Sequence, residues 1–289
     1  MSDITFFNGE WLPASEIVIP INDRGFLYAD AIFETARLHR GRFFRLRQHL
    51  ERLQASAQIL GIDAPRIAEL ERILEETARR AGHADASLRL ILTAGAGGRG
   101  LSRKGAGPPN LLVTISPVAS DWRESAARGW RVFTASTRRP PESSVPARLK
   151  ATGRPYALLA FFEAEAAGFD DALMLSADGL IAEGTTWNVF WRDGNTLCTP
   201  ALDVGILEGV TRSIILELAA REGLRTREVR MPRSELDHVD EVFATMTSRG
   251  IVPFAALDGR SFTLSADSLA ARLQQAYWTL VDNELAQTE

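Results

Sequence analysis

A lysine near the middle of the chain is the first residue whose type suggests covalent chemistry. The chain has 33 lysines and arginines, and only two of them, Lys104 and Lys150, are lysines. Arginine stays protonated, whereas a desolvated lysine amine can lose its proton and attack a carbonyl. Lys104 stands in a loop rich in glycine and proline, where a surface lysine needs no special role. Lys150 is therefore a candidate for imine chemistry, with an ordinary structural lysine as the alternative.

Other residues match what a pyridoxal-phosphate site requires. This cofactor needs a lysine for its aldehyde, a carboxylate at its pyridine nitrogen and an anion cradle for its phosphate. Glu183 ends an expected strand and could supply the carboxylate. Val210 and Thr211 follow Gly209 at the start of an expected helix, where backbone N–H groups can hold an anion. An ordinary helix capped by Thr211 would give the same pattern.

Arginine and hydroxyl side chains could complete such a site. Arg52 lies beside the apolar face of an expected helix, and Thr247 and Ser248 stand in a turn of small residues. A solvated surface arginine is the alternative for Arg52. A guanidinium can bind a carboxylate bidentately, so the candidates for a substrate carboxylate are Arg89, Arg99 and Arg249. For Arg89, an exposed position on a strand face is the alternative.

The glycine-rich stretch after residue 94 invites a nucleotide-binding interpretation. A strand expected over 88–93 runs into Gly95-Ala96-Gly97-Gly98-Arg99-Gly100. A dinucleotide-binding loop must open a helix whose N-terminus meets the pyrophosphate. This chain continues instead to Gly107-Pro108-Pro109, which does not open a helix. We therefore reject a dinucleotide fold and expect a flexible loop that could line a site.

Hydrophobic periodicity predicts the elements that must position these residues. Apolar residues at intervals of three and four predict a helix over 46–60, and alternation predicts a strand over 32–38. In that strand we interpret Glu34 as structural, because a charged residue there usually faces solvent. Further helices are expected over 64–81, 155–167 and 266–285. Another helix is expected after the segment Gly205–Arg212 and should run to Gly223. Further strands are expected over 5–7, 16–19, 88–93, 110–115, 131–136, 171–176, 180–183, 186–191, 196–199, 224–229, 241–245 and 251–257.

Composition limits the functional classes. The 289 residues carry a net charge of −4 and are 45% hydrophobic, which gives no reason to expect nucleic acid or a membrane as partner. The single Cys198 excludes an internal disulfide and fits a reducing cytoplasm, and four histidines with one cysteine make no convincing zinc site. No signal peptide is evident. We expect a small domain over 1–119, a linker over 120–127 and a large domain over 128–289.

Together, and in this order, the motifs resemble those of the class IV, fold-type IV aminotransferases. The resemblance covers nearly the whole chain. Its strongest pieces in the first half are Asp23-Arg24-Gly25, Tyr28-Ala29-Asp30-Ala31-Ile32-Phe33-Glu34 and His49-Leu50-Glu51-Arg52-Leu53. The second half contributes Lys150, Glu183-Gly184-Thr185-Thr186-Trp187-Asn188-Val189-Phe190, Gly205-Ile206-Leu207-Glu208-Gly209-Val210-Thr211-Arg212 and Asp240-Glu241-Val242-Phe243.

The resemblance implies a two-domain α/β (α+β) fold, with a small α/β domain and a larger domain built on a mixed sheet or pseudo-barrel with helices. It implies that Lys150 forms the internal aldimine with pyridoxal phosphate and moves the substrate proton, while Glu183 pairs with the pyridine nitrogen. The implied phosphate ligands are Arg52, Val210, Thr211, Thr247 and Ser248. A homodimer is also implied, in which Tyr28, Phe33 and the loop around 99–105 line the pocket, partly across the interface.

Some positions depart from the family pattern. Ala29, Ala31 and Met246 stand where glycine, or for Met246 glycine or asparagine, is common. The branched-chain enzymes place a tyrosine five residues after the lysine, where this chain has Pro155 followed by Tyr156. We expect a transaminase for D-amino acids or for a broad range of donors, with R-amines as a further candidate donor, that works with a 2-keto acid by a ping-pong mechanism. The alternatives are aminodeoxychorismate lyase chemistry, a protein that carries the cofactor without catalysis, and a cofactor-free binding protein.

Overall fold

The computed structural model describes residues 4–287, and the chain divides into two compact units. Unit 1 comprises Met1–Ala119 and Arg148–Gly153, and unit 2 comprises Ser120–Ala147 and Arg154–Glu289. The linker expected over 120–127 is instead part of unit 2, where residues Trp122–Ala127 form helix α4. Trp122 anchors that helix by packing on Trp278, with ring centroids 4.7 Å apart.

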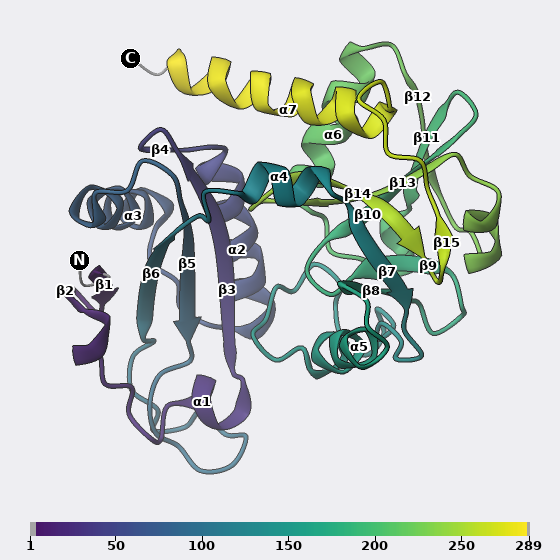
Figure 1. Cartoon of the computed structure of the whole chain (residues 1–289). Coiled ribbons are helices and arrows are strands. Elements are labelled where there is room, and N and C mark those ends of the chain that lie inside the picture. Colours follow the sequence, from purple (N-terminus) through teal and green to yellow (C-terminus); the bar gives the residue numbers. More distant parts are fainter. Residues whose placement is uncertain (1–3, 288–289) are drawn as a thin grey trace. The chain divides into compact units, whose positions relative to one another are not determined.

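Unit 1 is an antiparallel sheet with two helices on one face (Figure 1). Helices α2 (Leu46–Leu60) and α3 (Ile67–Ala81) bury their leucines against β5 and the neighbouring strands. Alternation along β3 turns Glu34 toward α2 and Phe33 toward the opposite face. In sheet order the strands are β2 (Glu10–Pro13), β1 (Ile4–Phe7), β6 (Leu111–Pro117), β5 (Ala86–Thr93), β3 (Ala31–His39) and β4 (Arg42–Phe43).

A segment from the second half of the sequence pairs with the start of β3. The backbone N–H of Phe33 donates to the carbonyl of Lys150 at 3.1 Å, and the N–H of Thr152 donates to the carbonyl of Ala31 at 3.0 Å. Leu149 packs against the core of unit 1. Residues 148–153 therefore belong to unit 1, although the sequence placed them in the large domain. Pairing between residues so far apart in the chain leaves no local periodicity to detect.

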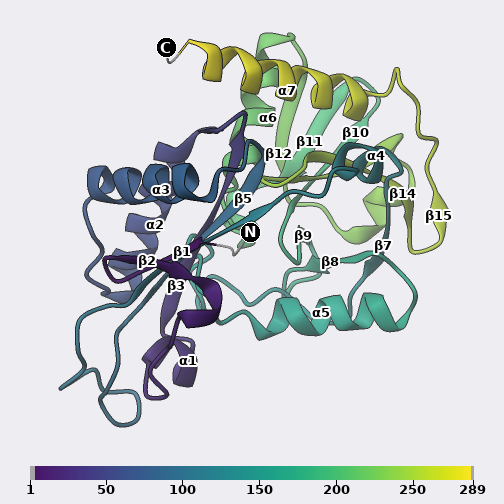
Figure 2. The same cartoon turned by 60° about the vertical axis from the view of Figure 1, so that its left-hand side comes forward.

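Helix α1 (Arg24–Tyr28) and the loop after β5 lie at the same end of the unit 1 sheet (Figures 1 and 2). The buried guanidinium of Arg24 donates to Asp30 at 2.9 Å and to the carbonyls of Gly100, Leu101 and Ser102. Arg103 also binds Asp30 and donates to the carbonyls of Leu60 and Gly61. Two arginines bound to one aspartate thus hold the glycine-rich loop in place.

Unit 2 contains a sheet whose strands close into a ring. The strand order is β12-β11-β10-β13-β14-β7-β8-β9, and β9 also pairs with β10, with Glu183 opposite Asn188. The strands β10, β13, β14, β7, β8 and β9 therefore form the barrel-like arrangement expected for the larger domain. The bounds are β7 (Trp130–Thr134), β8 (Asp171–Leu175), β9 (Ile181–Gly184), β10 (Asn188–Asp193), β11 (Thr196–Pro200), β12 (Arg225–Val229), β13 (Glu241–Met246), β14 (Gly250–Leu257) and β15 (Arg260–Ser261).

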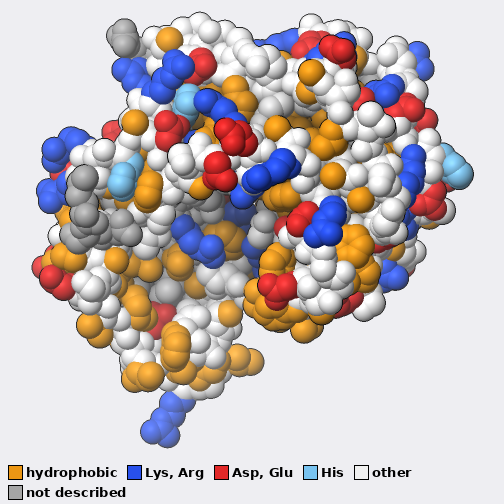
Figure 3. All heavy atoms as spheres, in the orientation of Figure 1, with side chains coloured by type: hydrophobic (Ala, Val, Ile, Leu, Met, Phe, Trp, Pro, Cys, Tyr) orange, Lys and Arg blue, Asp and Glu red, His pale blue; other side chains and the backbone are white. Residues whose placement is uncertain are grey.

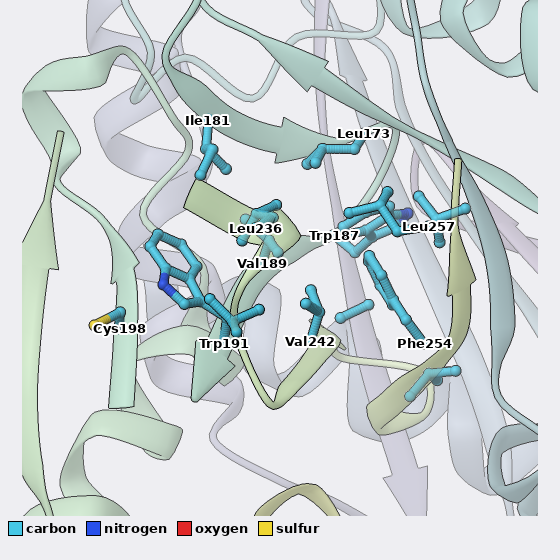
Figure 4. Close-up of a cluster of buried hydrophobic side chains, with 14 of the residues drawn as sticks. Leu173, Ile181, Trp187, Val189, Trp191, Cys198, Leu236, Val242, Phe254 and Leu257 are labelled. Atoms are coloured by element: carbon cyan, nitrogen blue, oxygen red, sulfur yellow. The ribbon is translucent and has the colours of Figure 1, made fainter. Parts of the chain in front are cut away.

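Apolar side chains from these strands form the core of unit 2 (Figure 4). Trp187 meets Phe254 edge to face, with ring centroids 5.5 Å apart, a geometry that aromatic pairs prefer. Val189 and Trp191 belong to this core, so alternation along β10 directs Asn188 and Phe190 to the other face. That other face carries Glu183, the candidate carboxylate, because Glu183 lies directly opposite Asn188.

Helices cover the outside of the unit 2 sheet. Helix α5 (Pro155–Ala166) packs on β7 and β8, and α6 (Val210–Arg221) packs on β12, β13 and α7 (Leu269–Ala286). Short 3₁₀ turns lie at Leu202–Val204 and Arg233–Asp237. Between residues 4 and 287, no helix combines the length and the apolar character needed to cross a membrane.

One expected strand is wrong. The turn at Asn8-Gly9 does form a hairpin, but β1 pairs with Glu10–Pro13 rather than with residues 16–19. Instead, a 3₁₀ turn at Ala14–Glu16 follows β2, and the chain then continues without regular structure. The apolar residues of the expected strand at 16–19 do not face a core, because Val18 is 77% exposed and Ile19 is also exposed.

Candidate active site

Lys150 is held in unit 1 by its backbone. Its N–H donates to the hydroxyl of Ser56 on α2 at 3.1 Å, and its carbonyl accepts from β3. The side-chain amine lies 4.7 Å from the centroid of the Phe33 ring. The guanidinium of Arg89 lies 4.4 Å from the same centroid. Lys150, Phe33 and Arg89, three candidates chosen from the sequence, are therefore neighbours in the structure.

Glu34 is buried, which corrects the expectation that it faces solvent. Its two carboxylate oxygens accept from Nε and Nη2 of Arg52 at 2.7 and 2.9 Å. One of them also faces Nδ1 of His49 at 3.1 Å and accepts from the backbone N–H of Thr35 at 3.1 Å. A charged residue can occupy the helix-covered face of β3 because α2 brings a guanidinium to it. The candidate phosphate ligand Arg52 is thus fixed in place by Glu34.

The charges around Glu34 determine its ionisation. Burial opposes the charged form, but the Arg52 guanidinium, the His49 hydrogen bond and the Lys150 ammonium hold the pKa of Glu34 well below its usual range. For His49, burial lowers the pKa, Glu34 acts in the opposite direction, and Arg52 and Lys150 lower it further. Glu34 is therefore an anion at neutral pH, and the cluster that contains Lys150 is electrostatically coupled.

Glu183 is the buried carboxylate of unit 2. One of its oxygens accepts from Nε of Arg139 at 2.6 Å, and the other accepts from the backbone N–H of Leu207 at 2.9 Å. Asn188 lies 3.5 Å from the second oxygen and donates to the carbonyl of Leu207 at 2.9 Å. The turn after Glu183 is anchored by Thr185, whose hydroxyl donates to a carboxylate oxygen of Asp171 at 2.7 Å.

The N-terminus of α6 lies close to this carboxylate. The residue that caps the helix is Gly209, and its cap makes no side-chain hydrogen bond, so Thr211 is not the cap that the sequence suggested. Glycine suits the cap position for a steric reason, because a Cβ on residue 209 would lie 2.1 Å from Oδ1 of Asn188. Because glycine occupies the cap, the N–H groups of Val210 and Thr211 begin the helix with no capping side chain in front of them.

The Thr247-Ser248 turn follows β13 and is held from α7. Gln274 accepts from the N–H of Ile251 at 2.8 Å and donates to the carbonyl of Arg249 at 3.1 Å. The guanidinium of Arg249 donates to the hydroxyl of Ser125 at 3.0 Å and lies over Trp130. These contacts tie the Arg249 side chain to the α4 side of unit 2.

The remaining candidates, Tyr28 and Arg99, are exposed at the α1 end of unit 1. Tyr28 is 40% exposed, and its ring lies 5.1 Å from the Arg24 guanidinium. Figure 3 shows hydrophobic side chains gathered around α1. The exposed apolar residues of helix α1 and of the loop held by Arg24, here called the α1 patch, are Phe26, Leu27, Tyr28 and Leu101.

Comparisons with known proteins identify the family. The chain matches the family described as amino-transferase class IV over residues 31–257. The chain belongs to the class IV aminotransferases. It is 34% identical over 256 residues to a putative branched-chain-amino-acid aminotransferase of Methanocaldococcus jannaschii, with 88% of each chain covered. It is 30% identical to the D-alanine aminotransferase of Bacillus licheniformis, with 98% of each covered.

A lyase and a solved transaminase structure are also similar to this aminotransferase. The aminodeoxychorismate lyase of Bacillus subtilis is 30% identical, with 96% of this chain and 94% of the relative covered. The branched-chain aminotransferase of Thermoproteus uzoniensis, solved with norvaline, matches with a TM-score of 0.90 at 30% identity, covering 97% of this chain and 95% of that one. The expected fold-type IV architecture is therefore confirmed.

Pyridoxal phosphate is the cofactor of this family, and the groups of the aminotransferase fit it. Unit 1 offers the amine of Lys150, and unit 2 offers the Glu183 carboxylate and the uncapped start of α6. The hydroxyl of Thr245 is buried and has no hydrogen-bond partner within residues 4–287. Thr245 lies opposite Asn188 and so shares the Glu183 face of the sheet. A buried hydroxyl left unpaired is costly, which is consistent with a ligand at this face.

Two groups in the site were not found from the sequence. Ser56 fixes the backbone of Lys150, and its position one turn after Arg52 on α2 was the only available signal. Arg139 contacts Glu183 from a segment without regular structure after β7. Nothing in its local sequence separates it from the many other arginines of the chain, because its partner is 44 residues away.

Proposed function

We propose that this aminotransferase transfers the amino group of an amino acid to a 2-keto acid, with a D-amino acid or a broad range of amino acids as donor. One observation carries the proposal: Lys150 and Arg89 lie 4.7 and 4.4 Å from the centroid of one ring, that of Phe33. An amine that reacts at Cα and a guanidinium that binds a carboxylate are the two groups an amino acid or keto acid requires.

In this proposal each residue has a defined task. Bound pyridoxal phosphate supplies an electron sink for negative charge at the substrate Cα. Lys150 would hold the cofactor and carry the Cα proton on Nζ, and Glu183 would accept a hydrogen bond from the protonated pyridine nitrogen. Phe33 forms an apolar wall that shields the lysine amine. The proposed phosphate ligands are Arg52, Val210, Thr211, Thr247 and Ser248.

The proposed donor range is supported by the relatives and by the geometry. Similarity to a D-alanine aminotransferase extends over 98% of the chain. Similarity to branched-chain enzymes is comparable, so branched-chain amino acids fall within the proposed range. Arg89 recognises only the carboxylate that all these donors share. Of the candidate arginines, Arg89 is therefore our choice for substrate binding, while Arg99 and Arg249 are weaker candidates.

We also propose that the enzyme acts as a homodimer in the cytoplasm. The α1 patch exposes a group of large apolar side chains, including Phe26 at 66% and Leu101 at 84%. Groups of exposed apolar side chains of this kind mark interaction sites. A second copy covering the α1 patch would place Tyr28 and the loop around 99–105 near a protein partner. The single buried Cys198 is compatible with a reducing compartment.

The proposal is tested with purified protein, pyridoxal phosphate, 2-oxoglutarate and a panel of donors: D-alanine, L-leucine, D-glutamate and (R)-1-phenylethylamine. We expect amino transfer from at least one amino acid, its loss in Lys150→Ala and its retention in Lys104→Ala. Arg89→Gln should raise the KM for amino acids about tenfold or more and leave the carboxylate-free amine unaffected. Activity that survives Lys150→Ala would refute the assignment.

Aminodeoxychorismate lyase activity is the second candidate. It is favoured by the 30% identity to the Bacillus subtilis lyase over 96% of this chain. The Thr93–Leu101 loop and the segment Ser248–Pro253 also resemble that branch, although D-amino-acid transaminases share the same features. Release of pyruvate from aminodeoxychorismate without any keto acid, together with no transfer from the donor panel, would replace the transaminase proposal with this one.

A further inference from the structure

Arg139 links two groups in unit 2 that lie beside the candidate cofactor carboxylate. Its Nε donates to Glu183 at 2.6 Å, and its Nη1 donates to the phenolic oxygen of Tyr156 at 3.0 Å. The guanidinium carbon lies 5.0 Å from the centroid of the Tyr156 ring. The backbone N–H of Arg139 donates to the carbonyl of Leu175 at 2.9 Å, which fixes the residue against the end of β8.

This ion pair lies in a dry environment. The side chains of Arg139 and Glu183 are 2% and 11% exposed. Burying such a pair costs so much desolvation that apolar replacements are often as stable, so stability alone is a weak reason for its presence. Removing one member is different, since it leaves an uncompensated buried charge.

The surroundings of Glu183 single out Arg139. Its other partners are the backbone N–H of Leu207 and the amide of Asn188, both neutral. Within residues 4–287, Arg139 is the one cation in direct contact with the Glu183 carboxylate. Around Tyr156, burial raises the pKa of the phenol, Arg139 and Arg154 act in the opposite direction, and Glu183 adds to the rise. Arg139 is thus the charge that the carboxylate and the phenol share.

We propose that Arg139 is a positioning residue that holds the Glu183 carboxylate oriented as the partner of the cofactor's pyridine nitrogen. The inference rests on the proposed role of Glu183. A Glu183 carboxylate turned away from the cofactor could not pair ionically with a protonated pyridine nitrogen, so the electron sink would weaken. The planar fork of arginine suits this task because it donates in two fixed directions at once, which a lysine ammonium does not.

The experiment measures the state of the cofactor rather than turnover alone. Holoenzyme is prepared with nitrogen-15-labelled pyridoxal phosphate, and the shift of the pyridine nitrogen is followed against pH. Arg139→Gln should lower the pH at which that nitrogen loses its proton by about one unit or more. It should also weaken cofactor binding about tenfold or more. Arg139→Lys retains the charge, so it should keep most of the nitrogen protonation and lose part of the affinity.

Double variants show whether Arg139 acts through Glu183. Once Glu183→Gln is present, adding Arg139→Gln or Arg139→Lys should change the nitrogen protonation and the affinity by less than about twofold, because coupled residues are not additive. Arg139→Lys gives this answer even if Arg139→Gln does not fold. Arg233→Gln is the matched control, since Arg233 is a half-buried arginine of unit 2 that pairs with Asp237 and Asp258 instead.

The outcomes separate this inference from the proposed function. If the pyridine-nitrogen shift of Arg139→Gln followed that of the wild type at every pH, the inference would be overturned and the proposed function would be unaffected. Effects of Arg139 and Glu183 that add in full would overturn it as well, because Arg139 would then act independently. Wild-type protein that binds no pyridoxal phosphate would overturn the role of Glu183, and with it the proposed function. Tyr156→Phe should leave the nitrogen protonated, since it spares the contact between Arg139 and Glu183.

Discussion

Replacing Glu34 by glutamine should destabilise unit 1 strongly. The variant keeps the shape of the side chain, but one carboxylate oxygen becomes an NH₂ group that cannot accept a hydrogen bond. Arg52 donates to both oxygens, at 2.7 and 2.9 Å, so either orientation of the amide costs Arg52 one bond. In one orientation the NH₂ group also faces His49 and the N–H of Thr35.

The magnitude follows from burial. Removing one member of a buried ion pair costs about 3–5 kcal/mol. The hydrogen bond that glutamine can still accept returns about 1 kcal/mol, so we expect a loss of about 2–4 kcal/mol in the free energy of unfolding at pH 7. The assay is equilibrium urea unfolding of cofactor-free protein, because ligand binding would otherwise add to stability. Glu51→Gln, on the exposed side of α2, removes only a surface pair with Arg47 and should change stability by less than about 0.5 kcal/mol.

The pH dependence provides a second check on Glu34. Its folded-state pKa is depressed, so its contribution is present above the unfolded pKa of about 4.3 and is lost as the pH falls toward the folded value. The difference between wild type and Glu34→Gln should therefore shrink as the pH drops below about 4.3. A Glu34→Gln variant within about 0.5 kcal/mol of wild type at pH 7 would refute the view that the pair is buried and coupled.

Two further predictions concern His49 and Gly209. The folded-state pKa of His49 is depressed, so unfolding takes up a proton below about pH 6.5 and stability should fall by up to about 1.4 kcal/mol per pH unit there. Urea unfolding of His49→Gln should no longer show this pH slope, and an unchanged slope would contradict the prediction. His238→Gln, a change at an exposed histidine, is the control and should retain the slope. Gly209→Ala places a Cβ 2.1 Å from Asn188, which should lower the free energy of unfolding by about 1–3 kcal/mol and weaken pyridoxal-phosphate binding in a fluorescence titration. The control is Gly107→Ala, because the nearest atom to the added Cβ there is 3.6 Å away. Equal affinities of the two variants for pyridoxal phosphate would show that α6 does not hold the phosphate.

Local patterns predicted the long elements well. Helix α2 spans Leu46–Leu60, the residues its apolar spacing indicated, and the strands at 171–199 form the expected antiparallel succession β8, β9, β10 and β11. The failures were non-local. Residues 16–19 are rich in β-branched side chains like a strand, but β1 pairs with Glu10–Pro13 instead. The segment 148–153 has no strand-like sequence, yet it extends the sheet because β3 offers an unpaired edge.

The site was predictable by residue type but not by electrostatic partner. The scarcity of lysine singled out Lys150, which the structure places beside Phe33 and Arg89. Glu34 was assigned to solvent because a strand pattern does not reveal which helix covers it. Its partner Arg52 was noticed for its place on α2, but not for this contact. Arg139 could not be identified from the sequence for a related reason. A buried ion pair forms where two distant segments meet, and the local sequence of neither segment indicates it.

The pairing of 148–153 with β3 has a consequence for how this protein can be divided. A fragment ending near residue 119 would leave the start of β3 as a bare edge, which is a template for pairing with other chains and hence for aggregation. The complementary fragment would carry Lys150 without the Ser56 hydroxyl and the β3 backbone that hold it. Neither half is a transplantable module. In a domain exchange or a circular permutation, the lysine has to travel with the sheet of unit 1, whatever its position in the sequence suggests.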